Sequence, residues 1–403
     1  MDATATLGQP RVLISRNSLL HNVRVLRGAL SPQTRICAMI KANAYGHGAE
    51  IIADTLANFS SDSVEAPAVD ALAVVTLDEA EALPHTPLPL LVLRPVENIY
   101  LGRQRQRLEQ AIRAGWILSV TSASAAKDLG RIALASARRV SVQIMIDTGM
   151  ARDGCDIDEL DGIVAAIESQ PALRLHGLST HFASSEEKDN PLTLEQLGRF
   201  MAATAPHVAR NPRLIRHAAN SGAIFFSPQS HLDMVRPGVS LYGIDPTFRP
   251  CIDRPLRPIL RWTAPLLSIR NMPAGGSVGY NQTWKAPRDT RIGLVPVGYA
   301  DGYLRSFSNR AMMLLRGKAV PVVGRVSMDY ATIDLGSLPD AAIGDEVTIL
   351  DSDPVSPASV YRLAKLADTI PYEIFCHIGR RMIRVGVEPA DSEVEREELR
   401  RIA

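Results

Sequence analysis

The sequence predicts an α/β protein in which a (β/α)8 barrel of the TIM type is followed by a mainly β domain. First, eight short apolar runs alternate with helical patterns over about the first 240 residues, which fits one closed barrel better than a doubly wound sheet. Second, polar motifs follow the ends of these runs. Third, the apolar runs beyond Pro246 are short and are separated by glycine and proline, which is typical of β structure.

The length and composition predict two domains. The chain has 403 residues and is 46% hydrophobic, so it can bury a large core but is too long for one ordinary domain. Near Pro246 the alternation of apolar runs and helical patterns gives way to a proline-rich passage and short β-like runs. This change places the barrel at residues 11–246 and the β domain at residues 247–403.

Charge and cysteine content exclude several classes of protein. Forty-four Lys and Arg residues against 43 Asp and Glu residues leave a formal charge of +1, so we expect no nucleic-acid or membrane partner. The four cysteines are far apart and form no CxxC pair, which favours a reduced, cytoplasmic chain without a metal site. The N-terminus resembles no signal peptide, and the most apolar stretch, residues 87–93, is too short to span a bilayer.

The barrel elements can be placed in order. A strand at Val12–Ile14 is followed by a helix that starts at Asn17-Ser18, and Thr76–Glu79 is a capping box at the start of another helix. Helical patterns also cover Glu159–Ile167 and Leu194–Met201. The eight predicted barrel strands are Ile36–Ile40, Ala71–Val75, Leu90–Leu93, Ile117–Val120, Val140–Ile146, Leu175–Ser179, Leu214–His217 and Met234–Pro237.

The second domain contains short β-like runs and one helical pattern, Ser359–Leu366. The predicted strands are Leu266–Ile269, Ile292–Val297, Met312–Leu315, Ala319–Val323, Ala331–Leu335 and Glu346–Leu350.

Polar residues follow five of the barrel strands. Because the carboxyl ends of barrel strands lie on one face, we expect these residues to form one site. They are Lys41 and Tyr45, Asp147–Arg152, Thr180-His181, His217–Gly222 and Arg236–Val239. Hydroxyl and N–H donors at Asn220-Ser221-Gly222 and Gly238-Val239 suit a phosphate, and a lysine facing a phosphate suggests pyridoxal phosphate held as a Schiff base.

Nine motifs make the interpretation more specific. In order and spacing they resemble the motifs of the alanine racemase family, from the first barrel strand almost to the C-terminus. They are IKANAYGHG, IDTGMAR, STHFA, HAANS, MVRPGVSLYG, VGYNQTW, GYADGYLR, VGRVSMD and PYEIFC.

The resemblance implies an isomerase that interconverts L-alanine and D-alanine by two-base proton transfer on pyridoxal phosphate, supplying D-alanine for peptidoglycan. It also implies a homodimer in which each barrel mouth is completed by the partner's β domain. Lys41 would carry the cofactor and act as the base on the D side of the α-carbon. Tyr280 in VGYNQTW would be the opposing acid and base for the L-enantiomer, contributed by the other subunit.

The resemblance assigns further roles. Arg236 would donate to the pyridine nitrogen, and because arginine stays protonated it would not give that nitrogen a proton. Tyr299 and Met328 would contact substrate, and Arg152 would reach both substrate and cofactor. The remaining cofactor-binding residues would be Tyr45, His181, Asn220, Ser221, Gly238, Val239 and Tyr372.

The chain departs from the family pattern near Arg152. Many relatives carry a carbamylated lysine two residues before Asp147, where this chain has Met145, so we expect Arg152 to be held by a bound anion or another side chain. The arginine motif reads GMAR in place of GMGR, and the cysteine often found before Met-Asp is Ser327.

Three alternatives stay open. The first is a racemase of broader specificity or one that prefers serine, which the change at Met145 permits. The second is a pyridoxal-phosphate decarboxylase on the same barrel, which fits SMD and VGYNQTW less well. The third is a barrel that binds the cofactor without catalysis, but such relatives are short and lack the β domain.

Overall fold

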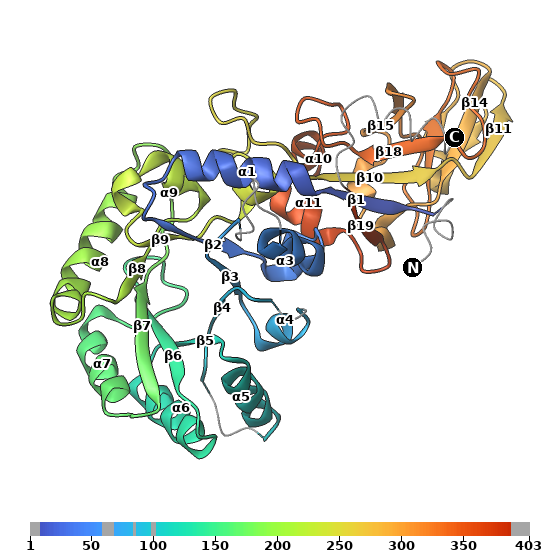
Figure 1. Ribbon diagram of the computed structural model, residues 1–403. Helices are drawn as coiled ribbons and strands as arrows, with labels where there is room; N and C mark the ends of the chain where they lie inside the picture. Colours follow the sequence, from blue (N-terminus) through green and yellow to red (C-terminus); the bar gives the residue numbers. More distant parts are fainter. Residues whose placement is uncertain (1–8, 59–67, 84–85, 98–101, 388–403) are drawn as a thin grey trace. The chain divides into compact units, whose positions relative to one another are not determined.

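The computed structural model describes residues 9–58, 68–83, 86–97 and 102–387 (Figure 1). The chain divides into two compact units that are not continuous in sequence. We call residues 23–44 and 52–241 the barrel unit, and residues 9–22, 45–51 and 242–387 the β unit. The IKANAYGHG motif is therefore shared: Lys41 belongs to the barrel unit and Tyr45 to the β unit.

Eight parallel strands close the barrel of the first unit, which confirms the predicted fold class (Figure 1). The ring closes where β9 pairs with β2, with Arg35 opposite Met234 and Ile36 opposite Val235. The strands are β2 (Arg35–Met39), β3 (Ala71–Val74), β4 (Leu90–Pro95), β5 (Ile117–Val120), β6 (Val140–Met145), β7 (Leu173–Ser179), β8 (Ile215–His217) and β9 (Met234–Val235). Each coincides with one of the eight predicted strands to within a few residues.

Helices follow the barrel strands, and their apolar residues recur at helical spacing. In α7 the buried residues Leu160, Ile163, Val164 and Ile167 form one stripe along the helix. Helix α1 (Arg16–Gly28) precedes the first barrel strand. The helices that follow barrel strands are α3 (Ala49–Asn58), α4 (Leu77–Glu81), α5 (Gly102–Ala114), α6 (Ala123–Ala135), α7 (Leu160–Glu168), α8 (Pro191–Arg210) and α9 (Ser221–Phe226). Among the described residues, none of the helices has the length and apolar character needed to cross a membrane.

The β unit is built on a six-stranded sheet of order β16-β15-β18-β10-β1-β19. Its strands are β1 (Arg11–Ser15), β10 (Leu260–Pro265), β15 (Met312–Leu315), β16 (Lys318–Pro321), β18 (Glu346–Leu350) and β19 (Ile383–Val387). Strand β1 lies between β10, which is antiparallel to it, and β19, which is parallel. The N-terminal strand is thus part of the same sheet as strands from the far end of the chain.

Two smaller sheets and two helices complete the β unit. They are the sheet of β11 (Ser268–Met272), β14 (Thr290–Val295) and β17 (Ala331–Asp334), the pair β12 (Ser277–Val278) and β13 (Trp284–Lys285), and helices α10 (Val360–Ala367) and α11 (Pro371–His377). All six predicted runs overlap a strand, and the predicted helix matches α10. The sequence patterns missed β10, β12, β13, β19 and α11.

Candidate active site

Lys41 lies directly after β2, at the start of an unusual turn. The short segment α2 (Lys41–Tyr45) contains four consecutive residues with positive φ: Ala42 at 51°, Asn43 at 54°, Ala44 at 54° and Tyr45 at 52°. A left-handed turn costs L-residues about 1–2 kcal/mol per residue, so the surrounding structure must hold it. The left-handed backbone thus begins at the residue after the lysine, before the two glycines of the motif, Gly46 and Gly48, which also have positive φ.

Two hydrogen bonds support this turn within the barrel unit. The Ala44 amide donates to the Ile40 carbonyl at 2.8 Å, which closes the turn on the end of the strand. The Ala42 amide donates to Oε1 of Glu79 at 2.8 Å. The residue after the predicted cofactor lysine is therefore fixed by a carboxylate from α4.

Arg236, after β9, is buried and is fixed by acceptors at the carboxyl ends of two other strands, β7 and β8. Its Nη1 donates to the His217 carbonyl at 2.8 Å and to His217 Nδ1 at 2.7 Å. Its Nη2 donates to the Thr180 carbonyl at 2.7 Å. Among the described residues Nε makes no hydrogen bond, and no carboxylate contacts the guanidinium. Burial lowers the pKa of Arg236 to about 10, which still leaves it charged at neutral pH.

The two histidines beside Arg236 are neutral, and the hydrogen bonds define their tautomers. Because a guanidinium can only donate, Nδ1 of His217 and of His181 must accept, which leaves the proton of each ring on Nε2. Burial first, and then the positive charge of Arg236, lowers the pKa of His217 well below its usual value. Burial, Arg236, Arg152 and Lys41 together lower the pKa of His181 to about 3.

The lowered pKa of His181 shows that four of the predicted site residues lie near one another. Lys41, Arg152 and Arg236 lie close enough for their charges to disfavour protonation of His181, although they follow three different strands. The structure therefore brings together these four side chains of the barrel unit, as expected for residues at the carboxyl ends of barrel strands.

The loops after β8 and β9 meet through the Ser221 hydroxyl. Ser221 Oγ accepts from the amides of Gly238 at 3.0 Å and Ser240 at 3.3 Å, so its own proton can be donated elsewhere. Asn220 caps α9, because its Oδ1 accepts from the Ala223 amide at 3.2 Å. Sequence reasoning treated the Gly238 amide as a phosphate donor, whereas here that amide is directed at Ser221.

Arg152 lies in a loop that starts at the end of β6. Its Nε is 3.4 Å from Oδ2 of the adjacent Asp153, and both side chains are about half exposed. Helix α8 holds the start of this loop, because Arg199 Nη1 donates to the Thr148 carbonyl at 3.0 Å. The same helix also holds the loop after β7, where Gln196 Nε2 donates to the His181 carbonyl at 3.0 Å. A single helix thus braces the loops that carry Arg152 and His181.

In the β unit, Tyr45 and Tyr372 belong to one aromatic cluster. The Tyr45 ring centroid is 5.9 Å from that of Tyr372 and 5.0 Å from that of Tyr242. Burial raises the pKa of Tyr45, so its hydroxyl keeps its proton and can donate to an anion. Two tyrosines that were predicted to bind the cofactor are therefore neighbours.

Three other predicted residues are exposed on loops of the β unit. Tyr280 is 69% exposed, Met328 53% and Tyr299 43%. The amides of Tyr299 and Ala300 donate to the carbonyls of Ser327 and Met328, both at 3.0 Å, so these two motifs form one unit. A Cβ at Gly298 would lie 2.3 Å from the Met328 carbonyl oxygen, which explains why glycine stands there.

A charge network braces the Met328 loop. Arg381 Nε donates to Oδ1 of the buried Asp301 at 2.5 Å, and its Nη2 to Oδ1 of Asp329 at 2.8 Å. Asp301 Oδ2 also accepts from the Gly298 amide at 2.9 Å. Arg381 thereby connects Asp301, near Tyr299, to Asp329, next to Met328. Sequence reasoning did not single out this arginine.

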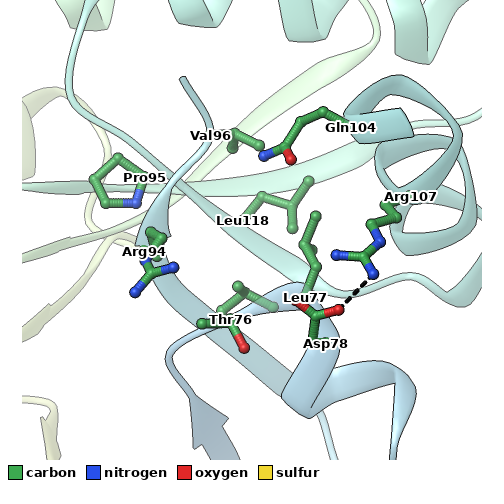
Figure 2. Close-up of a pocket in the computed structure, with 10 residues that line it drawn as sticks. Thr76, Leu77, Asp78, Arg94, Pro95, Val96, Gln104, Arg107 and Leu118 are labelled. Carbon is green, nitrogen blue, oxygen red and sulfur yellow. Dashed lines mark ion pairs between the residues drawn. The ribbon is translucent and has the colours of Figure 1, made fainter. Parts of the chain in front are cut away.

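A separate cavity lies at the carboxyl ends of β3 and β4, beside α5 and Leu118 of β5. Figure 2 shows that Thr76, Arg94 and Gln104 line it, together with Asp78 and Arg107, which form an ion pair at 2.5 Å. Its volume of about 80 Å³ has room for a few water molecules. It contains none of the predicted site residues.

Comparison with known proteins gives matches over most of the chain. The N-terminal domain of alanine racemase matches residues 14–246, and the C-terminal domain of alanine racemase matches residues 259–386. An alanine racemase of Desulfovibrio desulfuricans is 38% identical over 379 residues, which cover 93% of this chain and 97% of the relative.

Solved structures agree with this match. Alanine racemase from Streptomyces coelicolor is 33% identical, with a TM-score of 0.82 over 96% of this chain and 100% of its own. Alanine racemase from Bartonella henselae with covalently bound pyridoxal phosphate is 26% identical, with a TM-score of 0.78 over 94% of this chain and 99% of its own. The likeness extends through both units.

Proposed function

The chain belongs to the alanine racemase family, and from that premise we propose that it interconverts L-alanine and D-alanine with pyridoxal phosphate. We further propose that it works in the cytoplasm and supplies D-alanine for peptidoglycan. The observation that carries the proposal is the grouping of Lys41 with His181 and the fixed cation Arg236 at the barrel's carboxyl face.

The donors of this chain fit pyridoxal phosphate. Arg236 offers a buried cationic N–H that no carboxylate of the described residues contacts, and Ser221 offers a hydroxyl proton beside the α9 N-terminus. We propose that Lys41 holds the cofactor covalently and that Arg236 faces its ring nitrogen. The other proposed cofactor ligands are Tyr45, Arg152, His181, Asn220, Ser221, Gly238, Val239 and Tyr372.

When bound, pyridoxal phosphate supplies an electron-accepting ring that eases removal of the α-proton of an attached amino acid. Racemisation then needs two proton-transfer groups, because the proton leaves one face of the α-carbon and returns to the other. We propose the Lys41 amine for the D face and the Tyr280 phenol for the L face. A tyrosine with a pKa near 10 in solution is a poor base at pH 7, so the assembled site must favour its ionised form.

Arg236 sets how far charge moves into the ring. Its guanidinium stays protonated and donates a hydrogen bond without giving up a proton. The neighbouring histidines are neutral, and their Nδ1 atoms carry no proton to donate. Arg236 would therefore hold the ring nitrogen of pyridoxal phosphate by a hydrogen bond and would leave it unprotonated. This favours return of the α-proton over side reactions such as transamination.

We also propose a homodimer in which residues 247–403 of one chain complete the site that residues 11–246 of the other provide. Tyr280, Tyr299 and Met328 support this proposal, because three large side chains on neighbouring loops are exposed in the single chain. Met328 and Arg152 would hold the substrate carboxylate, and Tyr299 would line the entrance.

The test is α-deuterium exchange in heavy water across a panel of L- and D-amino acids. Fast exchange with alanine alone is expected. Comparable exchange with serine, lysine or arginine would instead establish a racemase of broader specificity, and no exchange with any amino acid would overturn the proposal. Lys41→Ala should lose the visible absorbance of the lysine-bound cofactor. Tyr280→Phe should lose exchange mainly from L-alanine.

A further inference from the structure

The Glu79 carboxylate accepts more hydrogen bonds than its capping box requires. In a capping box the carboxylate accepts from the N-cap amide, here Thr76, whose N is 3.2 Å from Oε2. Glu79 Oε2 also accepts from the Val75 amide at 2.7 Å, and Oε1 from the Ala42 amide at 2.8 Å. The shorter bonds are thus the two that lie outside the capping box.

The bond to Ala42 reaches the left-handed turn that follows Lys41. The first amides of any helical turn lack acceptors within the turn, and Ala42 is at that position. Glu79 supplies the acceptor from a different loop of the barrel unit. Since the residue before Ala42 is Lys41, the Cα of the lysine lies one peptide bond from an anchored amide.

We propose that Glu79 is a positioning residue for Lys41: its carboxylate joins the loop after β3 to the left-handed turn and so fixes the lysine backbone. The inference rests on the proposed function in that Lys41 carries the cofactor. Bonds from amides to a carboxylate are stronger than those to a neutral acceptor, which suits a turn built from non-glycine residues.

The decisive variant is Glu79→Gln, which keeps the side-chain length but places an NH2 group against one of the three amides. We expect faster hydrogen–deuterium exchange in the peptide covering residues 40–46. After borohydride reduction, less of the protein should carry the cofactor on Lys41. With both alanine enantiomers, kcat/KM should fall by roughly tenfold to a hundredfold, as expected for a misplaced reacting group.

Two control variants separate this role from helix capping. Thr76→Ala removes the other half of the same capping box, the bond from the Glu79 amide to Thr76 Oγ1 at 3.1 Å, and leaves the carboxylate in place. Glu159→Gln makes the same chemical change in another capping box, where Oε2 accepts from the Asp156 amide at 3.3 Å. Both controls should keep wild-type exchange in residues 40–46.

A rescue variant covers the case in which Glu79→Gln is merely unstable. Ala42→Gly relieves the steric cost of a positive φ at an exposed position, so adding it to Glu79→Gln should restore part of the cofactor attachment. The proposal is overturned if Glu79→Gln leaves exchange and attachment unchanged, or if Thr76→Ala affects both as strongly. Failure of the proposed function would instead appear in the wild-type protein, as absent alanine exchange.

Discussion

At the scale of residues, the most informative group is the buried cluster of Arg236, His217 and His181. The Arg236 guanidinium donates to backbone carbonyls and to two neutral imidazoles, and no carboxylate in the described part of the chain contacts it. Such a cluster gives a donor of fixed position and fixed charge. It also makes folding sensitive to acid, because both histidines lose their ability to bind a proton when the chain folds.

The pH dependence of stability tests this cluster. Below about pH 6.5 the unfolded chain protonates His217 and the folded chain does not, so the free energy of unfolding should fall as pH falls, by about 1.4 kcal/mol per pH unit for each such histidine. His181 should contribute from pH 6.5 down to about 3.

His217→Asn keeps an acceptor for Arg236 and removes the titrating ring. Urea unfolding between pH 6 and pH 4.5 should therefore show a shallower dependence on pH than in the wild type. An identical slope in the two proteins would mean that His217 is not buried in the neutral form.

Met145 allows a second residue-scale prediction. The nearest partner of Arg152 is the adjacent, half-exposed Asp153, and exposed pairs of this kind contribute little to rigidity. Met145→Lys would provide an amine that carbon dioxide can convert to an anionic carbamate near that loop. We expect KM for alanine to change several-fold and to depend on added bicarbonate. Identical kinetics with and without bicarbonate would contradict the prediction.

At the scale of elements, the site depends on loops that are joined in pairs. Gln196 and Arg199 of α8 join the loops of Arg152 and His181, Glu79 joins those after β2 and β3, and backbone bonds join the loops of Tyr299 and Met328. Each of these loops is thus held in part by contacts from a neighbouring element.

Gly298 tests the last of these pairs. Gly298→Ala would place a Cβ 2.3 Å from the Met328 carbonyl oxygen, so the two loops must separate. We expect unfolding to become easier by about 1–3 kcal/mol, as for other overpacked sites, and KM for alanine to rise because the Met328 backbone moves.

The matched control is Gly162→Ala in α7, where nothing lies within 4 Å of the added methyl group. It should stabilise the protein by about 0.5–1 kcal/mol and leave the kinetics unchanged. Equal effects of the two substitutions on KM would show that the Met328 loop does not contact substrate.

At the scale of the whole molecule, the proposed dimer has a direct test. Neither Lys41→Ala nor Tyr280→Phe protein should racemise alanine well alone. If Tyr280 acts in the partner's site, a mixed dimer has one site with both residues intact. Equal mixing and re-equilibration should restore about a quarter of wild-type activity, because half of the dimers are mixed and each has one working site.

The control for this mixture is a chain that carries both substitutions. Mixed with the wild type, it should give dimers with no intact site, and activity should fall with the fraction of mixed dimers. Absence of complementation between the single variants, with exchange of subunits verified by mass, would place Lys41 and Tyr280 in one chain.

The sequence by itself determined the barrel, because each of its strands is a local apolar run followed by a helix, and a parallel strand with such a connection pairs with its neighbour in order. Lys41, His181 and Arg236 could be recognised as candidates because each lies within two residues of the end of a strand, and Arg152 because it lies in the loop that follows β6. It predicted α10 and the capping box of α4 from local patterns of apolar and capping residues.

Tertiary structure decided what depends on distant partners. Strand β1 lies between β10 and β19, whose residues are hundreds of positions away, and no local pattern encodes that pairing. The left-handed turn after Lys41 is built from residues that ordinarily avoid positive φ, so only the surrounding contacts, including the Glu79 carboxylate, select it. Local sequence sets an element's preference, but the balance of non-local contacts sets its partners and its strained conformations.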